Sequence, residues 1–234
     1  MNMNISVYRK FEGFSLVEMA IVLTIVTVLL GGLLPTLSNQ IEQQRRNETR
    51  KQLAEIQQAL LGFAILNGRL PCPMPASNNN PSSALYGQEP ATGCAGNPSA
   101  EGYLPWKTLG VSEIDAWGTK RTGTGSPWNG YWRYRTDRNF SNASSLITLN
   151  TAFSVDALGV VDNSGNSLTS TTERPIAIVY STGPDLIPNG QNANFLANGD
   201  NYQSDVPNPN FDDILIWVSR PQLFNRMVAA GKLP

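Results

Sequence analysis

The sequence has no histidine and only two cysteines, and charged residues make up 15% of its 234 positions. Without histidine the chain lacks the most common general base, the imidazole of a Ser-His-Asp triad and the most common zinc ligand. Its 17 basic and 18 acidic residues nearly balance, which indicates no basic surface for nucleic acid. The composition therefore argues against an enzyme and against a nucleic-acid-binding protein.

One apolar segment runs from Phe14 to Leu37 with Glu18 as its only charge. At 1.5 Å per residue, a helix of this length crosses a hydrocarbon core of roughly 30 Å. Arg9 and Lys10 precede it, and such positive flanks stay in the cytoplasm, so the rest of the chain is expected outside. No A-x-A pattern ends the segment, so we expect it to be retained. The sequence predicts one membrane-spanning helix over 14–37.

Glu18 is unusual because a carboxylate inside a membrane helix costs a few kcal/mol and normally has a functional partner. The apolar segment contains no lysine, arginine or histidine that could be this partner. The alternative is structural, since Glu18 lies near the start of the helix and could extend to the membrane interface. Both interpretations stay open on these residues alone.

The residues at the start of the apolar segment are Gly13-Phe14-Ser15-Leu16-Val17-Glu18. This junction resembles that of the type IV pilins and the type II secretion pseudopilins. The resemblance implies that a prepilin peptidase removes a leader, 1–13, by cutting between Gly13 and Phe14, and that Phe14 is then usually N-methylated. It also implies that Glu18 pairs with the N-terminal amine of a neighbouring subunit during assembly.

The helix is predicted to continue as an amphipathic segment over 38–67. Pro35 matches a proline at which many members of the family interrupt the helix, in keeping with its missing N–H. Beyond it, four apolar residues repeat at spacings of three and four, and prolines follow Gly68 as a stop signal. The four are Leu53, Ile56, Leu60 and Phe63. The charges that crowd the preceding turns are explained by a solvated helix face, with a partner site as the alternative.

The two cysteines, Cys72 and Cys94, flank a stretch rich in Pro, Asn, Ser and Gly. In an exported chain such a pair predicts one disulfide. The chain-entropy model gives a loop of this size about 3 kcal/mol of stabilisation. A reactive thiol is disfavoured, because no histidine could activate it and there is no Cys-x-x-Cys spacing.

The remaining residues, 68–234, are predicted to form one loop-rich head with β-strands. Strands are expected at 131–135, 176–180 and 213–218, with weaker candidates at 146–149 and 153–161. A final helix is expected over 221–230, with Ser219 as its cap and a buried side of Leu223, Phe224, Met227 and Val228. With the long N-terminal helix, these elements predict an α+β fold in which the helix packs on an antiparallel sheet.

Two motifs of the head resemble pseudopilins. Asp115-Ala116-Trp117-Gly118, followed by the aromatic strand at 131–135, is similar to the segment with which their sheets begin, although the insertion between the two parts is longer here. Tyr180-Ser181-Thr182-Gly183, followed by Asp212-Asp213-Ile214, is similar to the ending of major pseudopilins, where a loop holds calcium.

The loop over 181–213 is long, has little periodicity and contains several acidic residues. The resemblance implies Ca²⁺, which prefers carboxylate and carbonyl oxygens in flexible loops. The expected ligands are Asp200, Asp205, Asp212 and Asp213. The alternative is that these are solvated turn residues, since Asp and Asn favour turns. No cofactor is required for the predicted function.

The sequence thus predicts a structural, non-catalytic subunit, a pseudopilin or minor pilin-like protein of a type II secretion pseudopilus or type IV pilus. Expected partners are prepilin peptidase, other pilin or pseudopilin subunits, an inner-membrane assembly platform and, before assembly, membrane lipid. The expected location is the bacterial inner membrane with the head in the periplasm, and then the filament. The alternatives are a membrane-anchored adhesin that binds through loops 73–102 and 181–212 and, less favoured, an anchored hydrolase, for which no nucleophile-elbow glycine pattern is present.

Overall fold

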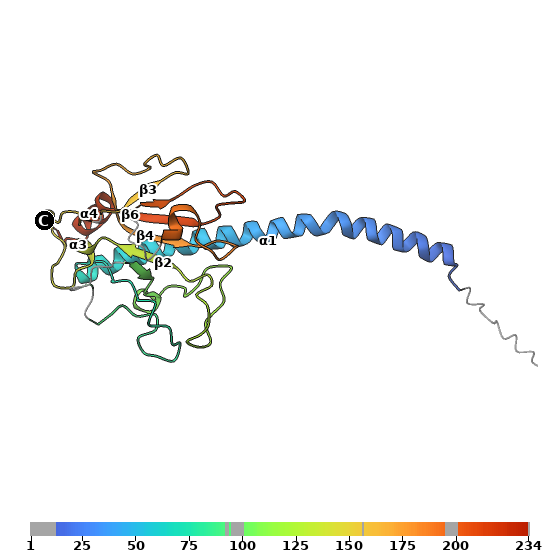
Figure 1. The fold of residues 1–234 in the computed structure, drawn as a ribbon, viewed down its shortest axis with the longest axis horizontal. Coiled ribbons are helices and arrows are strands. Elements are labelled where there is room, and N and C mark those ends of the chain that lie inside the picture. Colours follow the sequence, from blue (N-terminus) through green and yellow to red (C-terminus); the bar gives the residue numbers. More distant parts are fainter. Residues whose placement is uncertain (1–12, 92–93, 95–100, 156, 195–200, 234) are drawn as a thin grey trace, which may run out of the picture. The chain divides into compact units, whose positions relative to one another are not determined.

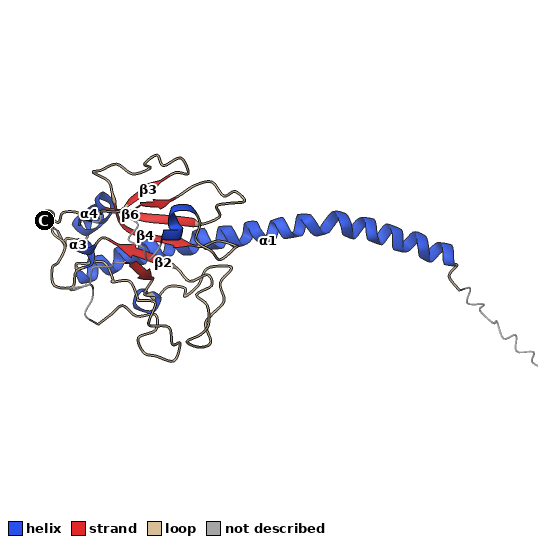
Figure 2. Cartoon of the chain, viewed as in Figure 1, coloured by secondary structure: helices blue, strands red, loops and turns tan. Residues whose placement is uncertain are grey.

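The computed structural model describes residues 13–91, 94, 101–155, 157–194 and 201–233. The chain divides into two compact units, Met1–Gln44 and Arg45–Pro234. Helix α1 (Leu16–Asn67) supplies residues to both units. The second unit is the head, and it contains all of the strands (Figures 1 and 2).

The head portion of α1 is amphipathic, as the apolar spacing predicted. Leu53, Ile56 and Leu60 are buried, with at most 1% of their surface exposed, whereas Phe63 is half-buried. The helix ends where Gly68 adopts a φ of 68°, a conformation that favours glycine, and the Gly68 N–H donates to the Ala64 carbonyl at 2.8 Å. This half of α1 therefore forms one wall of the head's core.

A four-stranded antiparallel sheet faces that wall. Its strands are β1 (Glu101–Tyr103), β2 (Arg133–Thr136), β4 (Pro175–Ser181) and β6 (Ile214–Ser219), in the order β1-β2-β4-β6. The three strands predicted with most support correspond to β2, β4 and β6, whereas β1 was missed. The α+β fold with a helix packed on an antiparallel sheet is confirmed.

All seven residues of β4 are buried because both faces of the sheet are covered. Val179 packs into the core with α1, together with Trp132 of the segment leading into β2. Ile178 and Tyr180 point to the opposite face, as the two-residue period of a strand requires. There they contact a second, smaller core cluster.

The second face is covered by a two-stranded parallel sheet of β3 (Gly159–Val161) and β5 (Asn201–Gln203). Val160 and Tyr202 are its main buried side chains. This sheet was not predicted. Of the two weaker strand candidates, 153–161 contributes only β3. The candidate 146–149 is wrong because these residues form a loop and a turn, in which Ile147 makes one backbone bond, to Gly68.

Helix α4 (Arg220–Ala229) follows β6, and Ser219 caps it by accepting a hydrogen bond from the Gln222 N–H at 3.4 Å. Leu223 and Met227 are fully buried as predicted, and Phe224 packs partly on the core. Val228 is 45% exposed, so its predicted burial is wrong. The described residues also form three shorter helices: α2 (Trp106–Leu109), α3 (Arg138–Ser141) and the 3-10 helix η1 (Gly190–Asn194).

β6 pairs with β4 on one side, and in the described part of the sheet it forms the edge. The Gln57 side-chain amide of α1 donates to the Trp217 carbonyl of β6 at 2.9 Å. The indole of Trp217 packs partly against the second core cluster. A side chain of the helix thus occupies an acceptor of the edge strand.

The long loops between α1 and β2 are held by a third cluster, in which four of the five buried side chains are aromatic. Its buried members are Met74, Tyr86, Tyr103, Trp106 and Tyr131. Trp128 stacks on Tyr103 with ring centroids 4.0 Å apart, and the Arg121 guanidinium lies 4.1 Å from the Trp128 centroid. Trp128 is therefore packed between an aromatic ring and a guanidinium group of its own chain.

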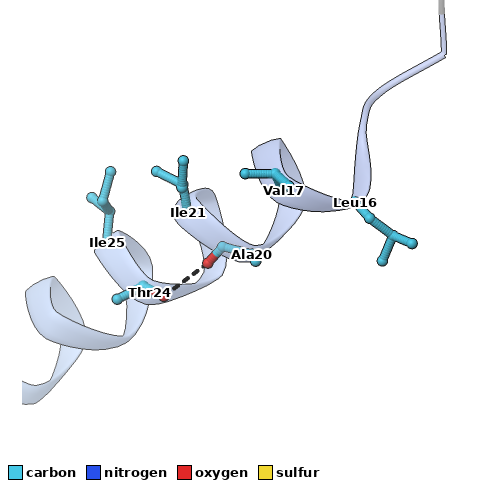
Figure 3. Close-up of a pocket in the computed structure, with 6 residues that line it drawn as sticks. All are labelled: Leu16, Val17, Ala20, Ile21, Thr24 and Ile25. Atoms are coloured by element: carbon cyan, nitrogen blue, oxygen red, sulfur yellow. Dashed lines mark hydrogen bonds between the residues drawn. The ribbon is translucent and has the colours of Figure 1, made fainter.

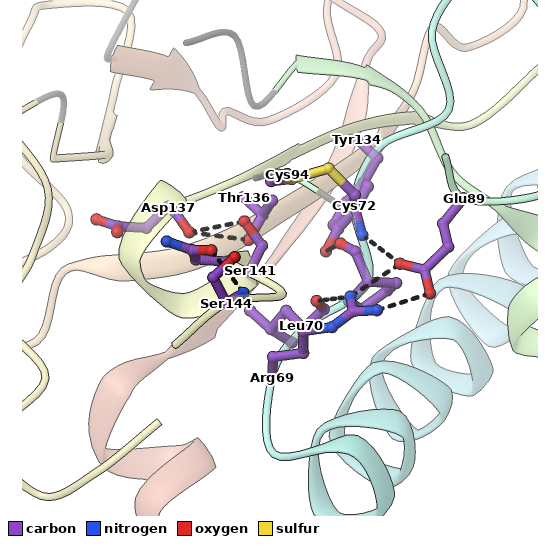
Figure 4. Close-up of a disulfide and its surroundings, with 12 residues drawn as sticks. Arg69, Leu70, Cys72, Glu89, Cys94, Tyr134, Thr136, Asp137, Ser141 and Ser144 are labelled. Carbon is purple, nitrogen blue, oxygen red and sulfur yellow. Dashed lines mark hydrogen bonds and ion pairs between the residues drawn. A yellow bond between two sulfur atoms is a disulfide. The ribbon is translucent and has the colours of Figure 1, made fainter. Parts of the chain in front are cut away.

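Cys72 and Cys94 form a disulfide with a Cα–Cα distance of 5.4 Å, as predicted (Figure 4). The loop that it closes is also held by Glu89. The Glu89 carboxylate accepts two hydrogen bonds from the Arg69 guanidinium, at 2.9 and 3.0 Å, and one from the Cys72 N–H at 3.0 Å. The Glu89–Arg69 pair lies beside the disulfide and fastens the same loop without a covalent bond.

Candidate functional site

The predicted cleavage junction lies outside the helix. Gly13 and Phe14 have no regular secondary structure and are exposed, and 84% of the Phe14 surface is accessible. α1 starts only at Leu16, and its first backbone bond runs from the Met19 N–H to the Ser15 carbonyl at 3.2 Å. The Gly13–Phe14 peptide bond is therefore in non-helical, accessible backbone.

Glu18 has a partner within its own chain. Its carboxylate accepts a hydrogen bond from the Ser15 N–H at 2.9 Å, and the Ser15 hydroxyl accepts one from the Glu18 N–H at 3.2 Å. This reciprocal pair is a capping box at the start of α1. Sequence reasoning looked for a basic partner and missed Ser15, although the Ser-x-x-Glu spacing is the signal for this arrangement.

The first turns of α1 present an apolar surface. Val17, Ile21 and Ile25 recur at four-residue intervals along the helix (Figure 3), and each is at least half exposed. The Thr24 hydroxyl donates to the Ala20 carbonyl at 2.8 Å, so its polar group is satisfied inside the helix. Among the described residues, no helix meets both the length and the apolarity expected of a membrane span.

Pro35 does not end the helix. α1 is continuous from Leu16 to Asn67, so the interruption expected at this proline is not a break in secondary structure. A proline removes one backbone donor, and the hydrogen bonds of the turns on either side can carry a helix past it.

The predicted calcium ligands do not all lie together. Asp200 lies outside the described residues. Asp205 accepts a hydrogen bond from the Asn163 N–H at 3.1 Å, next to the two-stranded sheet. Asp212 and Asp213 instead belong to a network around Asn189, whose side-chain oxygen accepts from the Asp212 N–H and whose N–H donates to Asp213.

A further acidic residue, Asp185, joins this network and was not among the predicted ligands. The Asp185 N–H donates to the Asp212 carboxylate at 3.2 Å, and the Asn189 side-chain amide donates to the Asp185 carboxylate at 3.3 Å. No group of three or more acidic or cysteine side chains within the described ranges has the arrangement of a metal site. In this acidic loop, backbone N–H groups and asparagine side-chain amides donate the hydrogen bonds that the carboxylates accept.

Asp213 is the most perturbed carboxyl group of this loop. It is 3% exposed, and burial, with smaller contributions from Asp212 and Asp185, raises its pKa to about 7. Hydrogen bonds from the Asn189 N–H and the Asn192 amide oppose the shift. One carboxylate oxygen of Asp213 and one of Asp212 are buried without a hydrogen-bond partner. Such oxygens favour a proton or a cation.

The two head motifs meet in the structure. The Ser181 hydroxyl donates to the Asp115 carboxylate at 2.6 Å, and both residues are buried. Asp115 also accepts from the Trp117 N–H at 2.9 Å. Close by, Gly130 has a φ of 70°, and a Cβ there would clash with Gly118 and Asp115. This arrangement fastens the segment that precedes β2 to the end of β4.

Comparison with known proteins places the N-terminal features in a recognised class. Residues 8–34 match the prokaryotic N-terminal methylation motif, and this match includes the junction, Glu18 and most of the apolar segment. The motif is the prepilin-type signal of type IV pilins and pseudopilins, so the chain carries that signal, and its α+β head is consistent with a pilin-like fold. The comparisons with curated proteins and with solved structures give no match.

Proposed function

We propose that this protein is a structural subunit of a pilus-like filament, a pseudopilin or minor pilin-like protein of a type II secretion pseudopilus or a type IV pilus. The observation that carries the proposal is the methylation motif over residues 8–34, whose scissile junction lies in exposed, non-helical backbone. Prepilin peptidase would cut after Gly13, and Phe14 would become the methylated N-terminus.

Before assembly, the subunit is held in the bacterial inner membrane by the segment from Phe14 to Leu37, with the head in the periplasm. The single charge of this segment and the basic residues Arg9 and Lys10 before it support this orientation. The apolar side chains at the start of α1 are exposed in the monomer, and they would then pack against lipid and, after assembly, against neighbouring subunits and the assembly platform.

In the filament, Glu18 pairs with the N-terminal amine of a neighbouring subunit. A buried carboxylate requires a compensating cation, and the apolar segment contains none. The N-terminal amine created by cleavage supplies that cation.

The pseudopilin assignment is favoured over the pilus assignment by the two head motifs, which the Asp115–Ser181 hydrogen bond brings into contact. The large head, with its second sheet and its aromatic cluster, favours a minor or specialised subunit. In this role the protein acts through assembly, and it needs no catalytic group.

Calcium binding by the loop over 181–213 is a further part of the proposal. Asp212 and Asp213 each have a buried carboxylate oxygen without a hydrogen-bond partner, which suits a hard cation with oxygen ligands. Asp205 instead accepts a hydrogen bond from the Asn163 N–H, so the proposed ligands are Asp212 and Asp213 alone. Backbone carbonyls of the loop would complete the coordination.

The experiment that tests the subunit function is N-terminal sequencing and intact-mass analysis of membrane-extracted protein, with and without a functional prepilin peptidase. Loss of residues 1–13 and an added methyl group on Phe14, only where the peptidase is active, are expected. An uncut chain in both strains would refute the proposal.

A further inference from the structure

We propose that the head carries a binding site for a neutral saccharide, in a hollow formed by α3 and the loop that follows it. This inference goes beyond the proposed function and does not depend on it. The hollow has a volume of about 300 Å³, which lies at the lower end of the range for small-ligand sites. Its polar lining consists of Asn139, Asn142, Ser145 and two threonines.

The polar groups of this hollow suit a ligand that both donates and accepts hydrogen bonds. The side chains that line it in the described part of the chain carry no charge, so they offer no ionic partner to an anion or a cation. In the same part of the chain, the Asn139 side-chain oxygen, the Asn142 side-chain nitrogen and the Ser145 hydroxyl have no hydrogen-bond partner. They provide an acceptor, a donor and a group that is both. The hydroxyls of a saccharide have the same double capacity.

The two asparagine side chains are held in direction by the chain itself. The Asn139 amide nitrogen donates to the Ala152 carbonyl at 3.0 Å, and the Asn142 side-chain oxygen accepts from the Ser144 N–H at 2.8 Å. In each planar amide one end is bonded within the chain, so the orientation of the other end is set. Groups that are already ordered lose little conformational entropy when a ligand binds.

The loop over 142–154 contains no helix or strand, but it is tied to the rest of the head. The buried Asp137 carboxylate, which caps α3, also accepts from the Ser154 N–H at 3.0 Å. In the middle of the loop the Ile147 N–H donates to the Gly68 carbonyl at the end of α1, at 2.8 Å. Because of these bonds the walls of the hollow are set before a ligand binds.

Leu146 supplies an apolar surface beside these polar groups. It lines the hollow, and 63% of its surface is exposed. A saccharide ring carries C–H groups on its faces and hydroxyls around its rim. Covering the C–H groups with Leu146 removes apolar surface from water, which favours binding. A neutral saccharide therefore matches both the polar and the apolar parts of the lining.

The test measures binding of the full-length protein to an array of neutral oligosaccharides, with sulfated and sialylated oligosaccharides alongside. The protein is kept in a detergent without a sugar head group, because such a head group would compete for the site. We expect binding to neutral members of the array. Binding to the charged members alone, or to no member, would overturn the inference and leave the subunit function untouched.

Three variants locate the binding. Ser145→Ala removes an exposed hydroxyl that makes no bond within the described chain, and it should lower the affinity about fivefold, the effect of one hydrogen bond. Ala152→Trp fills the hollow and should abolish binding. Ser144→Ala is the matched control, because Ser144 is exposed beside the hollow but does not line it, and it should bind as the natural protein does.

The melting temperature of each variant shows whether its head is folded. If Ala152→Trp melts below the natural protein, Ser145→Ala against Ser144→Ala decides the matter. Equal affinities in Ser145→Ala and Ser144→Ala, or full binding by a folded Ala152→Trp, would overturn the site. Cleavage after Gly13 is measured separately, so failure of the saccharide site and failure of the subunit function are distinguishable.

Discussion

Ser181 and Asp115, which lie 66 positions apart in the sequence, are joined by a buried hydrogen bond of 2.6 Å. It connects the segment before β2 to the end of β4, and it gives the buried Asp115 carboxylate its hydroxyl donor.

Replacing that hydroxyl should weaken the head. In Ser181→Ala the Asp115 carboxylate loses its hydroxyl partner in a site that already raises its pKa through burial, so we expect a loss of about 1–3 kcal/mol in the free energy of unfolding. Urea unfolding of the full-length protein in detergent would measure it. Ser144→Ala, at an exposed turn, is the matched control. Equal stability of the two variants would contradict the assigned role.

The disulfide and the Glu89–Arg69 pair should each stabilise the loop between Cys72 and Cys94. We expect the double substitution of both cysteines by serine to cost about 3 kcal/mol. Glu89→Ala should also destabilise, because it leaves the largely buried Arg69 without its carboxylate. Since both devices fasten one loop, the combined loss should differ from the sum of the separate losses, as a double-mutant cycle in urea would show. Strict additivity would indicate that the two act independently.

Stability should depend on pH through Asp213. Its folded pKa of about 7 lies above the ordinary value of 3.8, so the folded state holds the proton more tightly than the unfolded state. The resulting stabilisation is complete below about pH 4 and is lost as the pH rises towards 7. In the presence of a chelator, Asp213→Asn should reduce this decline in melting temperature, whereas Asp205→Asn should leave it in place. An unchanged profile in Asp213→Asn would assign the decline to other groups.

Calcium should reverse that loss at neutral pH. A cation bound to ionised Asp212 and Asp213 stabilises the folded state in proportion to its occupancy, so millimolar Ca²⁺ should raise the melting temperature at pH 7.5. Equal Mg²⁺ should have less effect, because Mg²⁺ prefers to keep its water ligands. The increase should be absent in Asp212→Ala. A melting temperature that does not respond to Ca²⁺ would exclude this site.

The sequence was sufficient for those parts of the fold that depend on local pattern. Apolar residues three and four positions apart predicted the wall formed by Leu53, Ile56 and Leu60, and the stop at Gly68 follows from glycine's access to positive φ. The continuous apolar run over 176–180 likewise predicted a strand, and β4 is buried along its whole length.

What could not be predicted depends on contacts between distant positions. β3 and β5 are three residues each, too short for a clear periodic signal; the candidate 153–161 contains β3, but β5 lies inside the loop over 181–213 that was expected to be irregular. At the acidic loop, sequence composition grouped Asp205 with Asp212, although the fold places Asp205 next to Asn163. The Ser15–Glu18 pair is different, because it is local and its Ser-x-x-Glu spacing is enough to predict a capping box.

The hydrogen bond from Gln57 to the Trp217 carbonyl bears on how edge strands of neighbouring molecules could pair. An edge strand with free backbone groups can pair with the edge of another molecule and start aggregation. In the proposed filament the heads would stand at high local concentration, where such pairing would compete with ordered growth. Because Gln57 already bonds the Trp217 carbonyl, β6 has one acceptor fewer for such pairing between heads.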